Sequence, residues 1–443
     1  MPCMQQLSRA FSRFFSHFYG GKAKMNNYIN IAIIGFGGRG TGLLQSEILP
    51  MCERDIRVVS VCDVYEDRAK RAADIVEKAG YPRPAAFTDY KEAIAVSGLK
   101  AVVISSAWES HLEVAMAAMK AGLQAATEVG GAYSVEDCWE LVRTYEETGK
   151  HCMLLENCCY GKEELSVLNM VRSGLFGTII HCEGGYHHDL RGEITYGKEE
   201  RHYRLRNYIN RNCENYPTHE FGPIAKVLDI NNGNRIMTLN SVASCSKGLH
   251  EFVMKGEHKD TPLANVNFYQ GDIVTTILKC QGGQTVTLTL DTSMARPYSR
   301  GFTVRGTNGF YFEDNYSVFL DEVHDDFVWS QNGMWGNAEE YVEKYKHKIW
   351  ENYSAHGGHG GMDWLVLSAF FDSVRTGTRP PIDTYDTATY MAITALSEQS
   401  IALSGATIFF PDFTRGKWYH RNDIEDTPFN LDKLEPFADL YQY

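Results

Sequence analysis

The sequence predicts an α/β protein in which a parallel sheet, covered by helices on both faces, is followed by an α+β domain with an open, mostly antiparallel sheet. In the first third of the chain, short uninterrupted apolar runs alternate with helical segments. Beyond residue 157 the expected strands are longer, and apolar and polar residues alternate along them. Continuous apolar strands are typical of parallel sheets buried on both faces, whereas alternation indicates a sheet with one solvated face.

The parallel part is predicted to occupy residues 28–156, with a domain boundary near Glu156, after which the pattern changes. Its crossovers are expected to be right-handed. The expected strands are Ile29–Ile34, Val58–Cys62, Ala101–Ser105, Leu123–Thr127 and Cys152–Leu155, and the expected helices run from the glycines after the first strand to about Leu49 and over Glu66–Ala79, His111–Ala121 and Val135–Thr148.

The second domain is predicted to span residues 157–443, with two closing helices that are free to pack back on the first domain. Residues 314–361 are aromatic and polar with weak periodicity, which predicts a long loop layer near the site or at a subunit contact. The expected strands are Thr178–Asp189, Ile236–Ser246, Asp272–Cys280, Thr285–Thr292 and Phe302–Phe312, and the expected helices are Glu164–Ser173, Met362–Thr376 and Thr384–Ser404.

The composition argues against polyanionic partners. The formal net charge is -13, so phosphate backbones and anionic lipid would repel the chain, and a neutral or polar small molecule is the expected partner. No apolar run reaches the ~20 residues that a bilayer span requires. The 11 cysteines show no metal-ligand spacing, which is typical of free thiols in a reducing compartment.

The first 27 residues mix basic and aromatic side chains but lack the apolar core and cleavage site of a secretory signal. We expect a disordered extension, or a sequence that starts upstream of its true initiator, Met25. With no export signal identified, the expected location is cytoplasmic.

A glycine turn follows the first expected strand. Gly35, Gly37 and Gly40 form the pattern G-x-G-x-x-G between a strand and a helix, and Gly38 and Arg39 complete the turn. The glycines allow the tight turn, the close approach of a pyrophosphate and close helix–strand packing. Asp63 ends the next strand, where a carboxylate accepts from a ribose 2′-hydroxyl and repels a 2′-phosphate. The sequence therefore predicts a Rossmann domain that binds NAD rather than NADP. Another doubly wound domain with a tight turn is the alternative.

Further segments resemble the glucose–fructose oxidoreductase and inositol dehydrogenase (Gfo/Idh/MocA) superfamily. They are Ser105–His111, Gly122–Glu128 and Leu396–Ile401. The resemblance implies that the second domain's sheet covers the nicotinamide and that the protein is a homo-oligomer. Trp108, His111, Glu128 and Asn157 would join the cofactor-binding residues.

Two departures from that superfamily change the expected chemistry. Its dehydrogenases carry Glu-Lys-Pro after the fourth strand, with the lysine moving protons, whereas this chain has Glu128-Val129-Gly130. They also carry an Asp and a His four residues apart on a helix at the site, where this chain has His219 and Pro223. The machinery for a simple alcohol oxidation is therefore missing or rebuilt.

The replacements resemble the NAD-dependent α-N-acetylgalactosaminidases of glycoside hydrolase family 109. The matching segments occur in the same order: 156–160, 183–191, 215–219, 296–300 and 359–363. By that resemblance the sugar site is lined by Glu156, Tyr186, His188, Tyr216, His219 and Tyr298. The residues after His219 depart from the family's Gly-Leu. Glu220, the first of them, would add an acid near the sugar or form a structural ion pair, which leaves the sugar and anomer open.

Residue spacing supports part of this assignment. Tyr186 and His188 are two apart on an expected strand and so face the same side; a half-buried strand with satisfied polar tips is the alternative. Tyr216 and His219 flank Pro217 at an expected helix start, where the helix dipole disfavours the charged form of His219. A packing or capping role is the alternative there.

Further candidates each have an alternative role. Glu156 follows the last parallel strand, where ligands bind, but it could equally form a salt bridge at the domain joint. Tyr298 would contact substrate or only pack. His356 and His359 lie in a glycine-rich segment expected near the cofactor, and without a partner of supporting spacing no metal is predicted.

The resemblance implies a glycosidase that needs NAD, and ordinary glycosidases use two carboxylic acids and no redox cofactor. The expected route is oxidation at C3 with His219 accepting the hydroxyl proton, removal of the C2 proton by Tyr186, elimination of the leaving group, addition of water and return of the hydride. His188, Tyr216, Glu156 and Tyr298 would orient the sugar. Three alternatives stay open: a sugar or inositol dehydrogenase that releases NADH, a non-catalytic NAD sensor, and a retaining glycosidase in which NAD is a relic.

Overall fold

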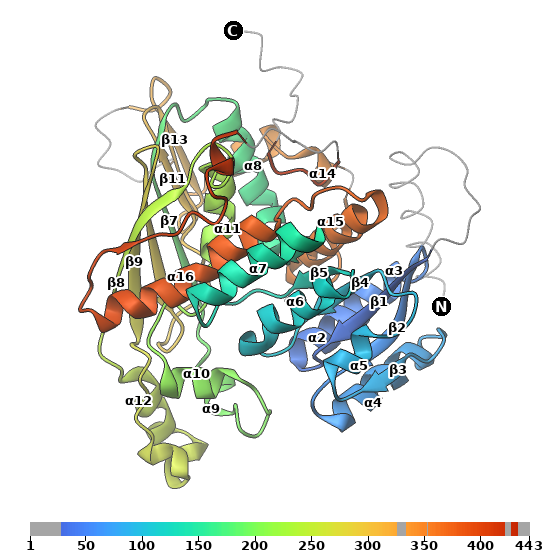
Figure 1. Cartoon of the computed structure of the whole chain (residues 1–443). Helices are drawn as coiled ribbons and strands as arrows, with labels where there is room; N and C mark the ends of the chain where they lie inside the picture. The colour runs from blue at the N-terminus through green and yellow to red at the C-terminus, as the bar shows by residue number, and fades with distance from the viewer. Residues whose placement is uncertain (1–27, 326–333, 352, 421–426, 433–443) are drawn as a thin grey trace.

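The structure is a computed structural model that describes residues 28–325, 334–351, 353–420 and 427–432 (Figure 1). The expected extension, residues 1–27, lies outside the described residues. The described chain contains a six-stranded sheet in the order β3-β2-β1-β4-β5-β6 and an eight-stranded sheet in the order β13-β12-β11-β7-β10-β9-β8-β14. The predicted fold class is confirmed.

The first sheet is parallel throughout, and its strand order reverses between β1 and β4. Strand β3 was not predicted, because its three residues at the sheet edge are mostly exposed and form no apolar run. The strands are β1 (Ile29–Ile34), β2 (Ile56–Cys62), β3 (Ala85–Phe87), β4 (Ala101–Ile104), β5 (Gln124–Thr127) and β6 (Cys152–Leu154). The helical segments are α2 (Gly38–Leu43), the π-helical η1 (Leu44–Ile48), α3 (Leu49–Met51), α4 (Glu66–Lys78), α5 (Tyr90–Ile94), η2 (Trp108–Ser110), α6 (His111–Lys120) and α7 (Val135–Thr148).

The second sheet is mixed, because β10 pairs with β7 in parallel while its other neighbours are antiparallel. The expectation of one strand over Phe302–Phe312 is wrong: Thr307 and Asn308 form a turn between two antiparallel strands. The strands are β7 (Ile179–His187), β8 (Ile236–Ala243), β9 (Ile273–Cys280), β10 (Thr285–Asp291), β11 (Thr303–Gly306), β12 (Gly309–Phe312), β13 (Ser317–Leu320) and β14 (Ile408–Phe409).

Residues 314–361 are not a continuous loop where the structure describes them. They include β13, α13 (Ala338–Lys344) and α14 (Lys348–Glu351), so that expectation is wrong for these parts. These elements are too short to produce a clear period in the sequence. The other helical segments of the second domain are η3 (Asn157–Tyr160), α8 (Lys162–Arg172), α9 (Arg191–Thr195), α10 (Arg204–Asn210), α11 (Thr218–Val227), α12 (Gly248–Lys255), η4 (Glu257–Asp260), η5 (Pro262–Asn265), η6 (His359–Gly361), α15 (Met362–Thr376), α16 (Thr384–Ala402) and η7 (Lys417–His420).

Helix α16 joins the two sheets and runs beside α7 in Figure 1. The Thr384 hydroxyl accepts from the Cys152 amide in β6, at 2.9 Å. Near the other end of the helix, the Ser400 hydroxyl accepts from the Ser241 amide in β8, at 2.8 Å. Helix α11 lies against β7, where Gly184 leaves room for Ile224. Helices α11 and α16 thereby cover part of one face of the large sheet.

Among the described helices, none combines the length and the apolar character that a membrane crossing requires.

Candidate functional site

The predicted cofactor-binding residues lie at the carboxyl edge of the parallel sheet. The loops after successive strands carry Gly35, Asp63, Trp108, Glu128 and Asn157, which follow β1, β2, β4, β5 and β6 in turn. In open α/β sheets this edge, at the point where strand order reverses, is the place where ligands bind.

The glycine turn has the packing that a dinucleotide requires. Gly35 has a φ of +97°, and a Cβ there would lie 2.4 Å from the Ser106 amide nitrogen. A Cβ on Gly40 would lie 2.1 Å from the Gly35 carbonyl oxygen. Around Gly38, by contrast, a Cβ would meet nothing within 4 Å. Two glycines therefore close the strand–turn–helix joint, and the middle of the turn is open for a pyrophosphate to approach the backbone.

Asp63 is held against this turn. Its Oδ2 accepts from the Phe36 amide at 2.7 Å, and its Oδ1 accepts from the Tyr65 amide at 2.9 Å. The carboxylate is thus fixed beside the open glycine turn, in the position where a ribose hydroxyl of a dinucleotide would lie.

Arg39 ties the glycine turn to α15. Its guanidinium lies 2.8 Å from Glu128 Oε1 and 2.6 Å from Asp363 Oδ2. Asp363 also accepts from Asn157 Nδ2 at 2.7 Å and lies 2.9 Å from His359 Nδ1. Burial opposes ionisation of Asp363, but hydrogen bonds from His359 and Arg39 hold its pKa below the usual range. The sequence reasoning missed Asp363 as the centre of this network, although its segment was noted.

His111 and Trp108 are buried supports at this edge. His111 is 1% exposed, and its Nε2 lies 3.0 Å from the Ser106 carbonyl oxygen. Burial lowers the pKa of His111 to about 4, so its ring is neutral. The Trp108 ring packs 5.6 Å from the Tyr216 ring, which connects the cofactor edge to the residues of the second domain.

The predicted sugar-site residues converge beside that edge. The Tyr186 ring lies 4.4 Å from Tyr216 and 5.6 Å from His219, measured between centroids. His188 lies 5.1 Å from Tyr298 in the same measure. The Tyr186 hydroxyl is 3.2 Å from His188 Nδ1, so these side chains face the same side, as predicted. Side chains from the end of β7, the start of α11 and the loop after β10 therefore form one cluster.

Two pKa shifts decide what the Tyr186–His188 pair can do. Burial raises the pKa of Tyr186 to about 12, although nearby Arg204 lowers it. Burial and Arg204 lower the pKa of His188. At neutral pH the pair therefore consists of a phenol and a neutral imidazole, and the imidazole can accept the phenol's proton.

Arg204 was missed by the sequence reasoning. Its guanidinium carbon lies 4.9 Å from the ring centroids of both Trp108 and Tyr216, and its Nη1 has no hydrogen-bond partner among the described residues. A buried cation beside these aromatic rings can stabilise negative charge that develops on a bound molecule. Arg204 lies between His188 and Tyr216 in the chain, at the start of α10, a seven-residue helix that no sequence pattern predicted.

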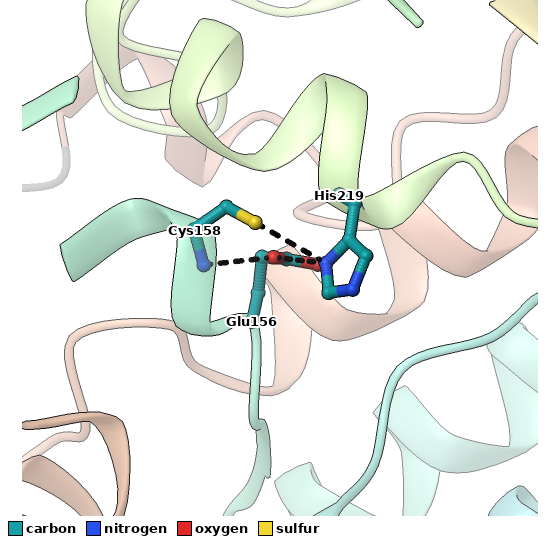
Figure 2. Close-up of side chains that lie close together, drawn as sticks. All are labelled: Glu156, Cys158 and His219. Carbon is teal, nitrogen blue, oxygen red and sulfur yellow. Dashed lines mark hydrogen bonds and ion pairs between the residues drawn. The ribbon is translucent and has the colours of Figure 1, made fainter. Parts of the chain in front are cut away.

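Figure 2 shows a second pair of proton-carrying groups, Glu156 and His219, together with Cys158. Glu156 Oε1 lies 2.7 Å from His219 Nδ1 and accepts from the Cys158 amide at 3.1 Å. Cys158 Sγ lies 3.5 Å from the same imidazole nitrogen. Glu156 is fully buried, whereas 10% of the His219 side chain is exposed, so the histidine stands in front of the carboxylate. Helix α11 begins at Thr218, so His219 is its second residue. Pro217 is the N-cap, one position before the first helical turn in which the sequence predicted it.

These three side chains offer ligand atoms within 4.8 Å of one another, and nitrogen, oxygen and sulfur are atoms that zinc binds. Zinc would need the thiolate, but burial raises the pKa of Cys158 well above its usual value. The hydrogen bond between Glu156 and His219 also uses the carboxylate oxygen and the imidazole nitrogen that a zinc ion would need as ligands. The arrangement suits a carboxylate that orients an imidazole better than it suits a metal centre.

Glu220 does not face the cluster. It is 2% exposed, and its Oε2 accepts from the Thr289 amide at 3.1 Å. Its neighbour is Glu214, which is also buried, and burial raises the pKa of both carboxyls. The pair therefore retains a proton. Neither expected role, an acid near the sugar or an ion pair, describes this arrangement.

The fold and the site together define a class: a Rossmann-type NAD-binding protein whose second domain presents a tyrosine and histidine cluster to the cofactor edge. Residues 29–155 match the family described as "Oxidoreductase family, NAD-binding Rossmann fold", and residues 160–420 match "Glycosyl hydrolase 109, C-terminal domain". The chain belongs to glycosyl hydrolase family 109 and is an NAD-dependent glycosidase.

Relatives of known name agree with this membership. A glycosyl hydrolase family 109 protein of Parabacteroides distasonis is 39% identical over 392 residues, covering 82% of this chain and 83% of that protein. An alpha-N-acetylgalactosaminidase of Tannerella forsythia is 39% identical over 391 residues, covering 82% of each chain. An alpha-N-acetylgalactosaminidase of Shewanella oneidensis is 34% identical over 411 residues, covering 89% of this chain and 87% of that one.

Solved structures share the fold at low identity. Levoglucosan dehydrogenase in complex with NADH and levoglucosan has a TM-score of 0.65 at 17% identity, covering 87% of this chain and 100% of that chain. An inositol dehydrogenase homolog from Azotobacter vinelandii, complexed with NADH and myo-inositol, has a TM-score of 0.59 at 14% identity, covering 87% and 98%. At these identities the likeness establishes the fold alone.

Proposed function

We propose that this enzyme hydrolyses a terminal N-acetylgalactosaminide by oxidising C3 for part of the cycle and eliminating the leaving group across C1 and C2. The observation that carries the proposal is the presence of two proton-carrying pairs in one cluster: Glu156 with His219, and Tyr186 with His188. One pair can serve the C3 hydroxyl and the other the C2 hydrogen. The sugar follows from the relatives named alpha-N-acetylgalactosaminidase.

In the first step His219 accepts the proton of the C3 hydroxyl. Glu156, behind the imidazole, accepts a hydrogen bond from Nδ1 and leaves Nε2 to act as the base. Glu156 is fully buried behind His219, which it contacts through Oε1, so we assign it to orienting His219 rather than to holding a sugar hydroxyl. Bound NAD supplies the hydride acceptor for this step and the hydride donor for its reversal.

In the second step Tyr186 takes the proton from C2, which the adjacent C3 carbonyl makes acidic. The phenol's own proton passes to His188 across their 3.2 Å contact. The C2–H electrons form a C1=C2 double bond, the C1–O bond breaks, and the alcohol leaves with the proton that the pair supplies. Water then adds its hydroxide to C1, and its proton returns through the pair to C2. Arg204, whose guanidinium lies beside the Tyr216 ring, would stabilise the negative charge that develops on the enolate oxygen.

The remaining residues orient the sugar. Tyr216 packs between Trp108 and Tyr186. It therefore positions the sugar ring between the cofactor edge and Tyr186, the base at C2. Tyr298 is half-exposed at the outer side of His188, where it contacts the sugar or its leaving group. His111 acts through the loop that it supports.

The decisive experiment uses the enzyme saturated with NAD⁺ and a nitrophenyl α-N-acetylgalactosaminide carrying deuterium at C2, with the corresponding glucosaminide, galactoside and β-anomer as a specificity panel. Exchange of the C2 deuterium with water in the released sugar, and a transient NADH absorbance, are expected. Full retention of deuterium would refute the elimination. Stoichiometric accumulation of NADH without release of nitrophenol would instead identify a dehydrogenase.

We also propose that the enzyme is a homo-oligomer that pairs through the uncovered face of the eight-stranded sheet. Val242, Ile277 and Phe409 share that face and are 54%, 43% and 85% exposed. Exposed apolar residues gathered on one face are typical of a protein contact. Phe409→Arg should lower the mass measured by light scattering, and an unchanged mass would argue against this interface.

A cytoplasmic location is proposed because the ten cysteines in the described part of the chain are all free and nine of them are buried. Free thiols are typical of reducing compartments. Cell fractionation tests this location.

A further inference from the structure

Two buried carboxyl groups, Glu214 and Glu220, lie beside the residues of the sugar site, and the proposed reaction uses neither of them. Glu214 is 0% exposed and stands two residues before Tyr216, whereas Glu220 is 2% exposed and directly follows His219. The two side chains hydrogen-bond each other. This acid pair therefore encloses, along the chain, the segment that carries two of the site residues.

Each carboxyl group of the acid pair also accepts from the backbone of the site. Glu220 Oε2 accepts from the Thr289 amide of β10 at 3.1 Å, and the Tyr186 amide of β7 is a further donor to Glu220. Glu214 Oε1 accepts from the Tyr216 amide at 3.5 Å. The acid pair thus connects the segment before α11, the helix itself and two strands of the large sheet.

Packing on both sides leaves the acid pair little room to move. The Glu214 amide donates to the Ser397 hydroxyl of α16 at 2.8 Å, and the Glu214 carbonyl accepts from the Thr394 hydroxyl at 2.6 Å. On the other side, a Cβ on Gly184 would lie 2.8 Å from the Glu220 carbonyl oxygen. Because Gly184 has no side chain, α11 can lie this close to β7. A change in the acid pair would therefore be passed to the backbone that it bonds.

A shared proton accounts for the polar atoms of the acid pair. Glu214 Oε2 and Glu220 Oε1 are buried, and neither accepts from an N–H or hydroxyl group of the described residues. Two ionised carboxylates would repel each other, so a proton between them satisfies both. A satisfied buried polar pair is rigid and specifies one geometry. Apolar groups of the same shape can be equally stable, so stability alone does not explain these two acids.

The backbone that the acid pair bonds carries the central rings of the site. The ring centroids of Tyr186 and Tyr216 lie 4.4 Å apart, and those of Tyr186 and His219 lie 5.6 Å apart. One ring comes from β7 and the others from the start of α11, so their spacing depends on how the helix is held on the sheet. Misplacing a reacting group by about 1 Å can cost about 10²-fold in rate.

We propose that the acid pair positions the catalytic groups: it holds the start of α11 on β7 and β10, so that His219 keeps its working distance from Tyr186. The inference rests on the proposed function, because it assumes that Tyr186 and His219 serve consecutive steps on one sugar. The acid pair acts through the backbone of the site residues, and its hydrogen bonds do the positioning.

Two variants separate positioning from stability. Glu214→Leu/Glu220→Leu removes the hydrogen bonds but keeps similar volume, so the melting temperature should stay close to that of wild type. We expect kcat on the nitrophenyl N-acetylgalactosaminide to fall about 10²-fold, with KM changed less than about threefold. NAD stoichiometry and affinity, measured by titration, should be unchanged, which shows that every molecule is folded. Glu220→Gln keeps a donor toward Glu214 and an acceptor for Thr289, so its kcat should stay within about threefold of wild type.

The matched control is Ser241→Ala/Thr276→Val. These two side chains are 0% exposed, and their hydroxyl oxygens lie 2.6 Å apart on β8 and β9 of the same sheet. The control therefore removes another buried hydrogen-bonded pair, but one that bonds no residue of the sugar site. Its kcat should equal that of wild type.

Four results would overturn the proposal. Wild-type kcat in the double leucine variant would refute positioning and leave the glycosidase function intact. An equal loss of kcat in the control, or in Glu220→Gln, would show that the hydrogen bonds of the acid pair are not the cause. If the double leucine variant does not fold, Glu220→Ala is compared with Glu220→Gln, and equal kcat in these two would refute positioning. Wild-type enzyme that neither releases nitrophenol nor exchanges the C2 hydrogen would refute the proposed function itself.

Discussion

Glu156 Oε1 lies 2.7 Å from Nδ1 of His219, so a carboxylate that follows the last strand of the parallel sheet holds an imidazole from the second domain. The carboxylate is fully buried and the imidazole reaches the site in front of it. This places an oriented base beside the edge where the cofactor binds. The predictions for Glu156 and His219 depend on that arrangement, and a stability prediction depends on the buried pair Glu214 and Glu220.

Glu156→Gln should lower kcat/KM by about 10²-fold, because the imidazole loses the carboxylate that fixes its tautomer and stabilises its protonated form. NAD binding should be unchanged. Steady-state kinetics and a cofactor titration measure the two effects. Glu146→Gln, which alters a surface ion pair on α7, is the control and should keep full activity. Full activity in Glu156→Gln would remove Glu156 from any role in orienting His219.

Tyr186→Phe and His219→Ala should separate the two halves of the reaction. Without Tyr186 the sugar can still be oxidised, so transient NADH should form while exchange at C2 and nitrophenol release fall at least 10²-fold. Without His219 neither NADH nor exchange should be detected. Stopped-flow absorbance and mass spectrometry of the sugar follow the two signals. Loss of the NADH signal in Tyr186→Phe as well would assign Tyr186 to the first step.

Glu220→Gln should make stability less sensitive to alkaline pH. Burial raises the pKa of both Glu214 and Glu220, so above the ordinary glutamate value of about 4.3 the folded protein keeps a proton that the unfolded chain has lost. The folded state then binds more protons, and stability falls as pH rises until the folded protein releases that proton too.

The variant has one fewer carboxyl in the pair, so its stability should exceed that of wild type by an amount that grows by about 1–3 kcal/mol from acidic to mildly alkaline pH. Urea unfolding across that range measures it. Parallel stability curves for the two proteins would contradict retention of a proton by the pair.

Asp63→Asn should weaken NAD binding about tenfold and reduce the preference for NAD over NADP. The amide can still accept from the Phe36 amide, so the turn should keep its shape, but the charge that repels a 2′-phosphate is gone. Fluorescence titrations with both cofactors give the ratio. If the wild type bound NADP as tightly as NAD, the assigned role of Asp63 would be wrong.

Dialysis against EDTA should leave the activity unchanged, whereas removal of NAD should abolish it. The cluster of Glu156, Cys158 and His219 holds a protonated thiol and an internal hydrogen bond, which disfavours a metal. Elemental analysis and activity after dialysis are the measurements. Activity that disappears with EDTA and returns with zinc would identify this cluster as a metal centre.

Much of the first domain and several site residues followed from local patterns. Apolar runs predicted five of the six parallel strands. The glycine spacing predicted the turn after the first strand, and the space around Gly38 leaves the centre of that turn open. The two-residue spacing of Tyr186 and His188 predicted their common side. These features depend on neighbours in the chain, so periodicity and spacing are enough to predict them.

Contacts between distant segments could not be predicted in this way. Arg39 meets Asp363 across more than three hundred residues, and Arg204 reaches the site from α10. Glu220 was read from its place beside His219, but residues adjacent on a helix point in different directions, and this one points into the interior.

The sequence by itself determined five of the six parallel strands and the dinucleotide turn, because each is encoded over a few neighbouring residues, and its resemblance to family 109 indicated the sugar-site residues. The tertiary structure alone decided that Glu214 and Glu220 lie together as a buried pair, and that His219 is partly exposed at the site while Glu156 is buried behind it. Such relations depend on how α11, α15 and α16 pack against the two sheets, and no local pattern records the distances between surfaces that meet only on folding.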